Sequence, residues 1–267
     1  MDLGLKGRKA IVTGGSLGIG KAIARELARE GADVAIVSRT KDMLEAAAGE
    51  LATETGRRVI AIPADVTSRT QVDGMVAQAA AQLGGLHILV NSGSPPGGSP
   101  SAVGPIENLV DEDLLHDFDV KYVGAVRCAR AAIPFMKEQR WGRIINISGL
   151  GARQTGVTIG SIRNVGVVAL TKNLADELGP SGISVVCVHP GLTRTEATPG
   201  VIERRSKAQG ISPAEVEKQM ASGNVLKRII TADEVAYVCT FLASPKAVAI
   251  NGDVISAGGG APGSIHY

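Results

Sequence analysis

A glycine-rich segment near the start of the chain has the residue types needed to bind a phosphate. It reads Thr13-Gly14-Gly15-Ser16-Leu17-Gly18-Ile19-Gly20 and directly follows the apolar run Lys9–Val12. Glycines allow a tight turn and a close approach of backbone N–H groups to an anion, and the first turn of a following helix adds unpaired N–H groups. A glycine pattern alone also fits a simple strand-to-helix turn, but here both the strand and the helix are expected. We therefore predict that a dinucleotide diphosphate is bound by Gly14, Ser16, Leu17, Gly18, Ile19 and Gly20.

The end of the second apolar run indicates which dinucleotide would bind. An acidic residue about 20 residues beyond the glycines would accept a hydrogen bond from the ribose 2′-OH. The chain instead has Ser38, Arg39 and Thr40 there, and its next carboxylate is Asp42. A guanidinium can form a fork with a 2′-phosphate, although an arginine at a strand end is also often only solvated. We expect Ser38, Arg39 and Thr40 to favour NADP(H), with NAD(H) still possible.

These residues must be positioned by regular elements, and the hydrophobic pattern predicts them. Short β-branched runs predict strands at Lys9–Thr13, Asp33–Ser38, Arg58–Pro63, Ile88–Asn91, Arg143–Ser148, Ser184–His189 and Val248–Ile255. A 3.6-residue periodicity predicts helices at Gly18–Glu30, Lys41–Thr55, Gln71–Leu83, Asp111–Gln139 and Ser161–Leu178. Alternating strands and helices predict the α/β class: a Rossmann-type doubly wound parallel sheet with helices on both faces, in one domain spanning residues 1–267. The charged segment 192–229 is expected to form a lid over the substrate.

Composition excludes several classes of protein. The 267 residues carry a net charge of +2, with 44% hydrophobic and 20% charged residues, so no basic surface points to nucleic acid. No apolar run is long enough to span a membrane, and the first residues lack the apolar region of a secretory signal. The three cysteines, Cys128, Cys187 and Cys239, are far apart, which is typical of a reducing cytoplasm. No metal-ligand spacing is present, and we expect a cytoplasmic protein with a small-molecule substrate.

Four further segments, in the same order and spacing, resemble the short-chain dehydrogenase/reductase family over nearly the whole chain. They are Asp65-Val66 after the third strand, Asn91-Ser92-Gly93 at the end of the fourth, Pro190-Gly191 after the sixth and Asn251-Gly252 before the last. Each alone also fits a cap or a turn. Their shared position at the carboxyl ends of parallel strands favours a binding site.

The resemblance implies hydride transfer in a Rossmann-type domain, and it implies roles for the matching residues. Asp65 and Val66 would hold the adenine, and Asn91 and Gly93 would line the cofactor site. Thr193 and Thr195, after Pro190 and Gly191, would bind the nicotinamide carboxamide. The family usually forms homodimers or homotetramers through the two long helices, so the same assembly is expected here.

The chain departs from this family where the proton is transferred. The family uses Asn, Ser, Tyr and Lys, with the Tyr and Lys four residues apart on one helix face. Aligned on Ala169–Lys172, the Tyr position is Gly160 and the Lys position is Asn164. The Ser position is Gly149, and the Asn position is Lys121. No tyrosine lies between residues 123 and 236, so a small shift in alignment cannot restore the pair.

Two of the family's four catalytic positions carry each other's residue type, which suggests a different catalytic set. Lys121 occupies the family's Asn position and Asn164 its Lys position, and in the family these two side chains approach the same volume. We hypothesise a set of Lys121, Ser148 and Asn164, in which Lys121 supplies the cation near the nicotinamide ribose and the proton, and Ser148 holds the substrate oxygen. A lysine on a long helix more commonly extends to solvent.

Three functions are therefore open. The first is an NADP(H)-dependent oxidoreductase that acts on an unidentified carbonyl or alcohol through a non-standard proton donor. The second is a catalytically inactive NADP(H)-binding protein with a sensing or structural role. The third is a non-redox lyase or isomerase on the same fold, because a fold does not determine function.

Overall fold

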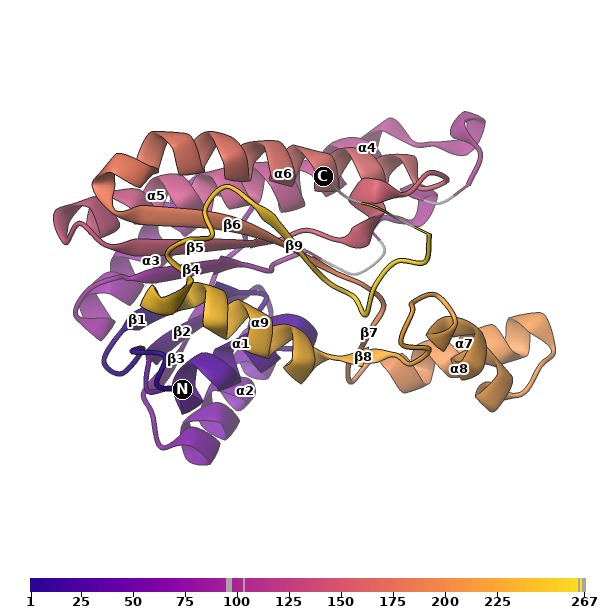
Figure 1. Ribbon diagram of the computed structural model, residues 1–267, viewed down its shortest axis with the longest axis horizontal. Coiled ribbons are helices and arrows are strands. Elements are labelled where there is room, and N and C mark those ends of the chain that lie inside the picture. Colours follow the sequence, from indigo (N-terminus) through magenta and orange to yellow (C-terminus); the bar gives the residue numbers. More distant parts are fainter. Residues whose placement is uncertain (95–97, 103, 264, 266–267) are drawn as a thin grey trace.

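The computed structural model describes residues 1–94, 98–102, 104–263 and 265. Within these residues, seven strands form one parallel sheet (Figure 1), namely β1 (Lys9–Thr13), β2 (Asp33–Ser38), β3 (Val59–Pro63), β4 (Ile88–Asn91), β5 (Gly142–Ile147), β6 (Ile183–Pro190) and β9 (Val254–Ala257). The strand order is β3-β2-β1-β4-β5-β6-β9. The order reverses between β1 and β4, which makes their carboxyl ends the switch point where ligands bind in such sheets.

The central strands are apolar on both faces because helices cover both sides of the sheet. Val12 of β1 pairs with Ile36 of β2 on one side and with Val90 of β4 on the other, and all three side chains are buried. Such continuous Val and Ile runs are typical of parallel sheets. The predicted Rossmann-type doubly wound α/β fold is confirmed.

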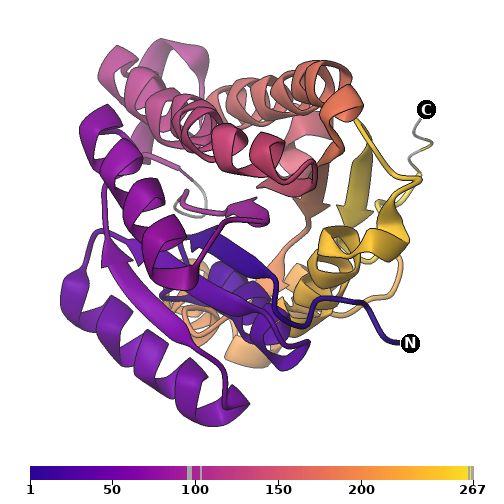
Figure 2. The same cartoon turned by 90° about the vertical axis from the view of Figure 1, so that its left-hand side faces the viewer.

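The helices divide into two layers, as Figure 2 shows. One core cluster joins the sheet to α1 (Gly18–Arg29), α2 (Lys41–Thr55) and α9 (Ala232–Ala243). The other joins its opposite face to α3 (Arg69–Leu83), α5 (Gly124–Glu138) and α6 (Thr158–Leu178). The hydrophobic pattern indicates five of these six helices, but α9 is not among the predicted elements.

The long helix predicted over Asp111–Gln139 is present as a continuous helical segment, with a π turn in its middle. It consists of α4 (Asp111–Phe118), a π-helical turn over Asp119–Val123, and α5. A π turn inserts one residue into the helix and is frequent at functional sites. The final strand is shorter than predicted: a 3₁₀ turn at Pro245–Ala247 precedes it, and β9 begins only at Val254.

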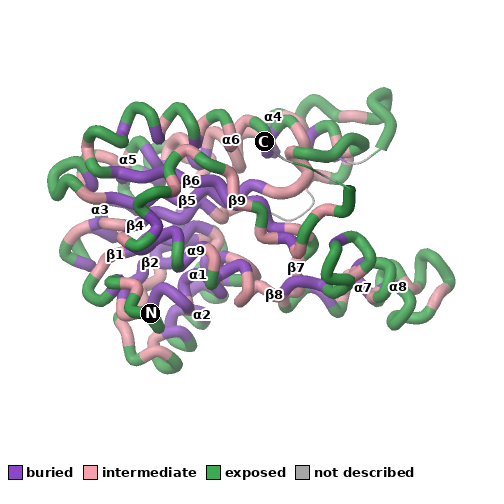
Figure 3. Tube along the Cα trace, viewed as in Figure 1, coloured by how far each residue is buried: buried purple, intermediate pink, exposed green. Residues whose placement is uncertain are grey.

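Residues 192–229 contain two helices that project beyond the end of β6 (Figure 1). They are α7 (Thr198–Gln209) and α8 (Pro213–Ala221), framed by the short parallel strands β7 (Thr193–Arg194) and β8 (Ile230–Thr231). A small apolar cluster of Ile202, Val216, Met220 and Ile229 holds them together. Figure 3 shows that most of this segment is exposed, in contrast to the buried strands.

The single tryptophan lies at the amino end of the sheet. Trp141 precedes β5, and the guanidinium groups of Arg8 and Arg143 lie 3.9 and 4.7 Å from its ring centroid. His87 packs at an angle to the same ring. In the part of the chain that the structure describes, no helix is long and apolar enough to cross a bilayer.

Candidate active site

The glycine loop is built so that larger residues cannot replace two of its glycines. Gly14 has a backbone φ of +67°, and a Cβ there would lie 2.4 Å from the carbonyl oxygen of Ser92. A Cβ on Gly20 would lie 2.2 Å from the carbonyl oxygen of Gly14. The N–H of Gly14 donates to the carbonyl of Val37 at 2.7 Å, which fixes the loop against β2. The loop thus leads directly into the first turn of α1, where N–H groups can meet an anion.

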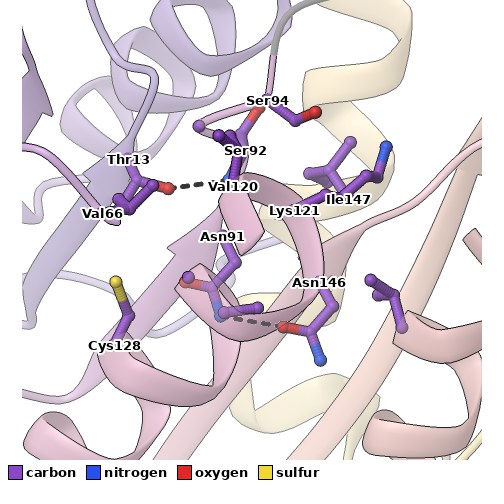
Figure 4. Close-up of a pocket in the computed structure, with 14 residues that line it drawn as sticks. Thr13, Val66, Asn91, Ser92, Ser94, Val120, Lys121, Cys128, Asn146 and Ile147 are labelled. Atoms are coloured by element: carbon purple, nitrogen blue, oxygen red, sulfur yellow. Dashed lines mark hydrogen bonds between the residues drawn. The ribbon is translucent and has the colours of Figure 1, made fainter. Parts of the chain in front are cut away.

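A polar network connects this loop with the ends of the central strands (Figure 4). The N–H of Ser92 donates to Thr13 Oγ1 at 2.9 Å, and Asn91 Nδ2 donates to Asn146 Oδ1 at 2.8 Å. Asn146 in turn donates to Thr171 Oγ1 on α6. Among the described residues, Asn91 Oδ1 has no hydrogen-bond partner. Gly93 thus lies next to Thr13 and Gly14 of the glycine loop, and the binding of the cofactor by Asn91 and Gly93 stays a prediction.

The predicted adenosine side of the site lies at the ends of β2 and β3. Arg39 and Thr40 are exposed there, while the Ser38 hydroxyl is buried and has no partner among the described residues. The Asp65 carboxylate accepts hydrogen bonds from the N–H and the hydroxyl of Thr67. Burial acts to raise the pKa of Asp65, but these bonds and the charge of Arg39 outweigh it and hold the pKa below its usual value. Arg39 and Asp65 thus lie within electrostatic reach of each other.

The segment after β6 reaches back to the glycine loop. Thr193 Oγ1 donates to the carbonyl of Gly191, and the N–H of Thr195 donates to Thr198 Oγ1. The next side chain, Glu196, accepts a hydrogen bond from the N–H of Gly18 at 3.0 Å. A carboxylate therefore lies at the helix N-terminus where the sequence predicts a diphosphate.

Lys121 lies in the middle of the π turn, and its side chain points inward. Its Nζ donates to the carbonyl oxygen of Ser148 at 2.9 Å. Burial and, to a smaller extent, the charge of nearby Arg163 lower the pKa of Lys121 from its ordinary value to about 7, although Cys187 and Asp117 act in the opposite direction. At neutral pH such an amine is present in both its protonated and neutral forms, which is the condition for a general acid or base.

Ser148 and Asn164 complete the predicted catalytic set, but their contacts differ from the sequence hypothesis. The Ser148 hydroxyl donates to the backbone carbonyl of Asn164 at 3.0 Å, and both residues are buried. Among the described residues, the Asn164 Oδ1 atom has no partner. The Ser148 carbonyl oxygen thus accepts a hydrogen bond from Lys121, while the Ser148 hydroxyl donates to the backbone of α6. The structure brings the three residues together, and of the three it is Lys121 that lines the cavity at the end of the central strands.

A buried ion pair beside this set was not found from the sequence. Asp117 and Arg163 are 1% and 5% exposed, and Arg163 Nη1 lies 3.1 Å from Asp117 Oδ2. The sequence contains no signal that pairs residues 46 positions apart on two helices. Asn146 was also missed, although a polar residue inside the apolar run of β5 is the kind of signal that indicates a site.

The space at this point of the sheet is small in the structure. A cavity of about 20 Å³, room for about one water molecule, is lined by Thr13, Asn91, Asn146, Lys121 and neighbouring residues (Figure 4). In the described part of the chain, no group of three or more His, Cys, Asp or Glu residues is placed to hold a metal ion. The side chains that line the cavity include the amine of Lys121, the amides of Asn91 and Asn146, hydroxyls and the thiol of Cys128.

Comparison with known proteins gives the family. The family model for enoyl-(acyl carrier protein) reductase matches residues 14–261. The NADPH-dependent reductase BacG of Bacillus subtilis is 35% identical over 261 residues, or 97% of this chain and 99% of that protein. The D-beta-hydroxybutyrate dehydrogenase of Rhizobium meliloti is 32% identical and covers 95% of this chain and 98% of its own. The crystal structure of L-sorbose reductase from Gluconobacter frateurii, complexed with NADPH and L-sorbose, superposes with a TM-score of 0.92 at 30% identity and covers 99% of this chain and 100% of that one. The chain belongs to the short-chain dehydrogenase/reductase family.

Proposed function

We propose that the protein is an NADP(H)-dependent oxidoreductase that acts on the carbonyl or alcohol group of a small molecule, with Lys121 in place of the usual tyrosine as proton donor. The observation that carries this proposal is the inward position of the Lys121 amine, 2.9 Å from the Ser148 carbonyl at the carboxyl end of β5. Gly160, which stands at the tyrosine position, has no group that can donate a proton.

The residues present fit NADP(H). Gly14 and Gly20 leave a cradle that a Cβ would fill, and the exposed guanidinium of Arg39 at the end of β2 suits a 2′-phosphate. We assign cofactor binding to the residues that the sequence predicts: Gly14, Ser16, Leu17, Gly18, Ile19, Gly20, Ser38, Arg39, Thr40, Asp65, Val66, Asn91, Gly93, Pro190, Gly191, Thr193 and Thr195. Bound NADPH supplies the hydride. Three relatives support the assignment, because BacG, the L-sorbose reductase structure and the structure of YwfH, 33% identical with a TM-score of 0.87, are described with NADPH.

Lys121 performs the proton transfer in this proposal. In reduction, its ammonium donates a proton to the carbonyl oxygen as that oxygen gains negative charge, and the neutral amine remains. In oxidation, the neutral amine accepts the alcohol proton. The Ser148 carbonyl orients the amine, and Asn164 holds Ser148 through the hydroxyl bond at 3.0 Å.

The test of this function is a turnover assay with purified protein. NADPH is incubated with a ketose sugar, acetoacetate, pyruvate and a set of simple ketones, and the absorbance of the reduced nicotinamide is followed. We expect NADPH to be consumed with at least one carbonyl compound. Tight binding of NADPH without turnover on any of them would instead support the inactive cofactor-binding protein.

Replacing Arg39 by Met should remove the preference for NADPH. A charge-assisted hydrogen bond is worth about 1.5–3 kcal/mol, so NADPH affinity should fall about 10- to 100-fold while NADH affinity changes little. Calorimetric titration with both coenzymes measures this. Arg69→Met is the matched control, because Arg69 is a solvent-exposed arginine whose ion pair with Asp73 lies on α3. Equal affinity for NADH and NADPH in the wild-type protein would contradict the assignment.

Replacing Glu196 by Gln should strengthen NADPH binding. The Glu196 carboxylate accepts the Gly18 N–H at 3.0 Å and so competes with, and repels, an anionic diphosphate. Gln can still accept the Gly18 N–H, so only the charge repulsion is lost, and the dissociation constant should fall about 1.5- to 5-fold, from about 0.2–1 kcal/mol for an interaction between exposed charges. Glu203→Gln, on the exposed face of α7 beside Lys207, is the control. Weaker binding by Glu196→Gln would show that the carboxylate assists the cofactor.

We further propose that residues 192–229 form the substrate lid and that the protein is a cytoplasmic homodimer or homotetramer. The exposed α7 and α8 follow β6 directly at the edge that carries the site. A groove of about 290 Å³ on the outer face of α5 and α6, lined by Ile133, Leu170, Leu174 and neighbours, suits burial against a second copy. The three cysteines are buried and free, as in a reducing compartment. A monomer in light scattering at micromolar concentration would contradict the assembly.

A further inference from the structure

Two opposite charges are almost fully buried near Lys121. The Asp117 carboxylate on α4 and the Arg163 guanidinium on α6 form an ion pair of 3.1 Å, and both side chains are more than nine-tenths buried. Burial of a charged pair is costly and gives little stability compared with apolar residues of the same size. The presence of this ion pair at a buried position is therefore not explained by a contribution to stability.

The loop after β4 is fitted closely onto this pair. Ser99 donates its N–H and its hydroxyl to the Asp117 carboxylate, with the hydroxyl at 2.8 Å. Gly98 has a φ of +90°, and a Cβ there would lie 2.3 Å from Asp117 Oδ2 and 3.1 Å from Arg163 Nη1. Among the described residues, Arg163 Nε has no partner. Gly98 and Ser99 therefore pack directly against the pair, and a side chain at position 98 would collide with the carboxylate.

The pair is connected to Lys121 along two routes that close a ring. Asp117 lies four residues before Lys121 on the same helical segment, where it passes from α4 into the π turn. On the other side, Lys121 Nζ donates to the Ser148 carbonyl, and the Ser148 hydroxyl donates to the carbonyl of Asn164, the residue after Arg163. The Arg163–Asp117 contact completes the ring. Both charges act electrostatically on the amine, Arg163 lowering and Asp117 raising its pKa after the larger effect of burial.

We propose that the Asp117–Arg163 ion pair is a positioning unit that sets the charge carried by Lys121 at neutral pH. This inference rests on the proposed function of Lys121, which it deepens, because it explains how an amine can take the place of a tyrosine hydroxyl. Arg163 opposes a second positive charge nearby, and Asp117 limits that opposition. Burial brings the pKa of Lys121 down toward neutrality, and the two charges of the pair adjust it there in opposite directions.

The charged and titratable groups facing Lys121 come from three elements. Arg163 on α6 lowers the pKa of Lys121, whereas Cys187 on β6 and Asp117 on α4 raise it. The Cys187 thiol itself has its pKa raised to about 12 by burial, so it remains neutral at pH 7. Asp117 and Arg163 are therefore the two facing groups that carry full charge. Their effects on the pKa of Lys121 have opposite signs. Removing one charge should therefore shift this pKa in the opposite direction from removing the other, which unfolding would not do.

The experiment measures the titration of Lys121 directly in the protein without cofactor or substrate. The protein is trace-labelled with acetic anhydride over a range of pH, and mass spectrometry gives the labelling of the peptide with Lys121 relative to the other lysines. In Arg163→Met, the midpoint should move to higher pH, and in Asp117→Asn to lower pH, each by at least about 0.5 pH unit. Arg163→Lys, which keeps the positive charge, should keep the midpoint near that of the wild-type protein.

Breaking one partner of a buried pair can prevent folding, so a neutral pair provides a second test. Asp117→Asn with Arg163→Gln keeps a side-chain hydrogen bond without either charge, and the Lys121 midpoint should rise by less than in Arg163→Met. Midpoints that stay unchanged, or that move in the same direction in both single variants, overturn the proposal. Because labelling requires no turnover, an inactive wild-type protein would refute the proposed function and leave this measurement valid.

Discussion

Replacing Lys121 by Met is expected to lower the turnover number for carbonyl reduction about 10²–10⁴-fold, the usual contribution of a positioned general acid. The physical reason is that the Met side chain has no proton to give, and Gly160 at the tyrosine position has none either. The measurement is kcat with NADPH at saturating carbonyl substrate, together with the NADPH dissociation constant. A Lys121→Met protein with unchanged turnover and unchanged NADPH affinity would eliminate Lys121 from the mechanism.

The matched control is Lys121→Arg, which separates the charge from the proton. Arginine keeps the cation but does not lose its proton in proteins, so cofactor affinity should survive while turnover does not. The pH profile adds a second check. Because the pKa of Lys121 is about 7, the wild-type reduction rate should fall at higher pH as the ammonium is lost, and this fall should be absent in Lys121→Met.

The substitution Lys121→Met should also raise the thermal stability of the protein. The pKa of Lys121 is lower in the folded protein than its ordinary value of 10.5, so between about pH 7 and 10.5 the unfolded chain binds the additional proton. The free energy of unfolding therefore rises with pH across this window, and near pH 7 the buried lysine is a cost. Met removes that cost, and a melting temperature above that of the wild-type protein would show that lost turnover is not lost folding.

Replacing Gly14 by Ala is expected to weaken NADPH binding by about 100-fold. An L-residue at a φ of +67° costs about 1–2 kcal/mol, and the new Cβ would lie 2.4 Å from the Ser92 carbonyl oxygen. The loop must therefore move away from β4, and a displacement of about 1 Å in a binding site is enough for such a loss. Calorimetric titration with NADPH measures it.

Gly56→Ala provides the control for backbone strain alone. Gly56 ends α2 with a φ of +64°, and no described atom lies within 4 Å of the position its Cβ would take. The control should lower the melting temperature, because the left-handed conformation becomes strained, yet leave the NADPH dissociation constant unchanged. If Gly14→Ala binds NADPH as well as Gly56→Ala does, the glycine loop does not hold the diphosphate.

The scaffold could be predicted from the sequence because its signals are local. The strand segments around Val12, Ile36 and Val90 are apolar on both faces. This pattern is typical of a sheet that helices cover on both sides. The helix α9 was missed although Thr231 and Glu234 form a capping box at its start, a pattern that the sequence displays.

The electrostatics of the site could not be predicted, because they depend on tertiary contacts. Sequence position indicates that Lys121 and Asn164 approach one volume, but it does not show whether the amine turns inward or extends to solvent. The π turn decides this by rotating the residues after Phe118 relative to a regular helix. Likewise, no local pattern in the chain joins Asp117 to Arg163, since their contact exists only once α4 packs against α6.

The position of Trp141 has a practical consequence for spectroscopy. It is the only indole in the chain, and it lies between Arg8 and Arg143 before β5, whereas Ser148 follows the far end of that strand. A six-residue strand spans about 20 Å, so a bound coenzyme does not touch the indole. Its intrinsic fluorescence will therefore follow unfolding of the amino edge of the sheet, and coenzyme can change that emission only by absorption or energy transfer through space.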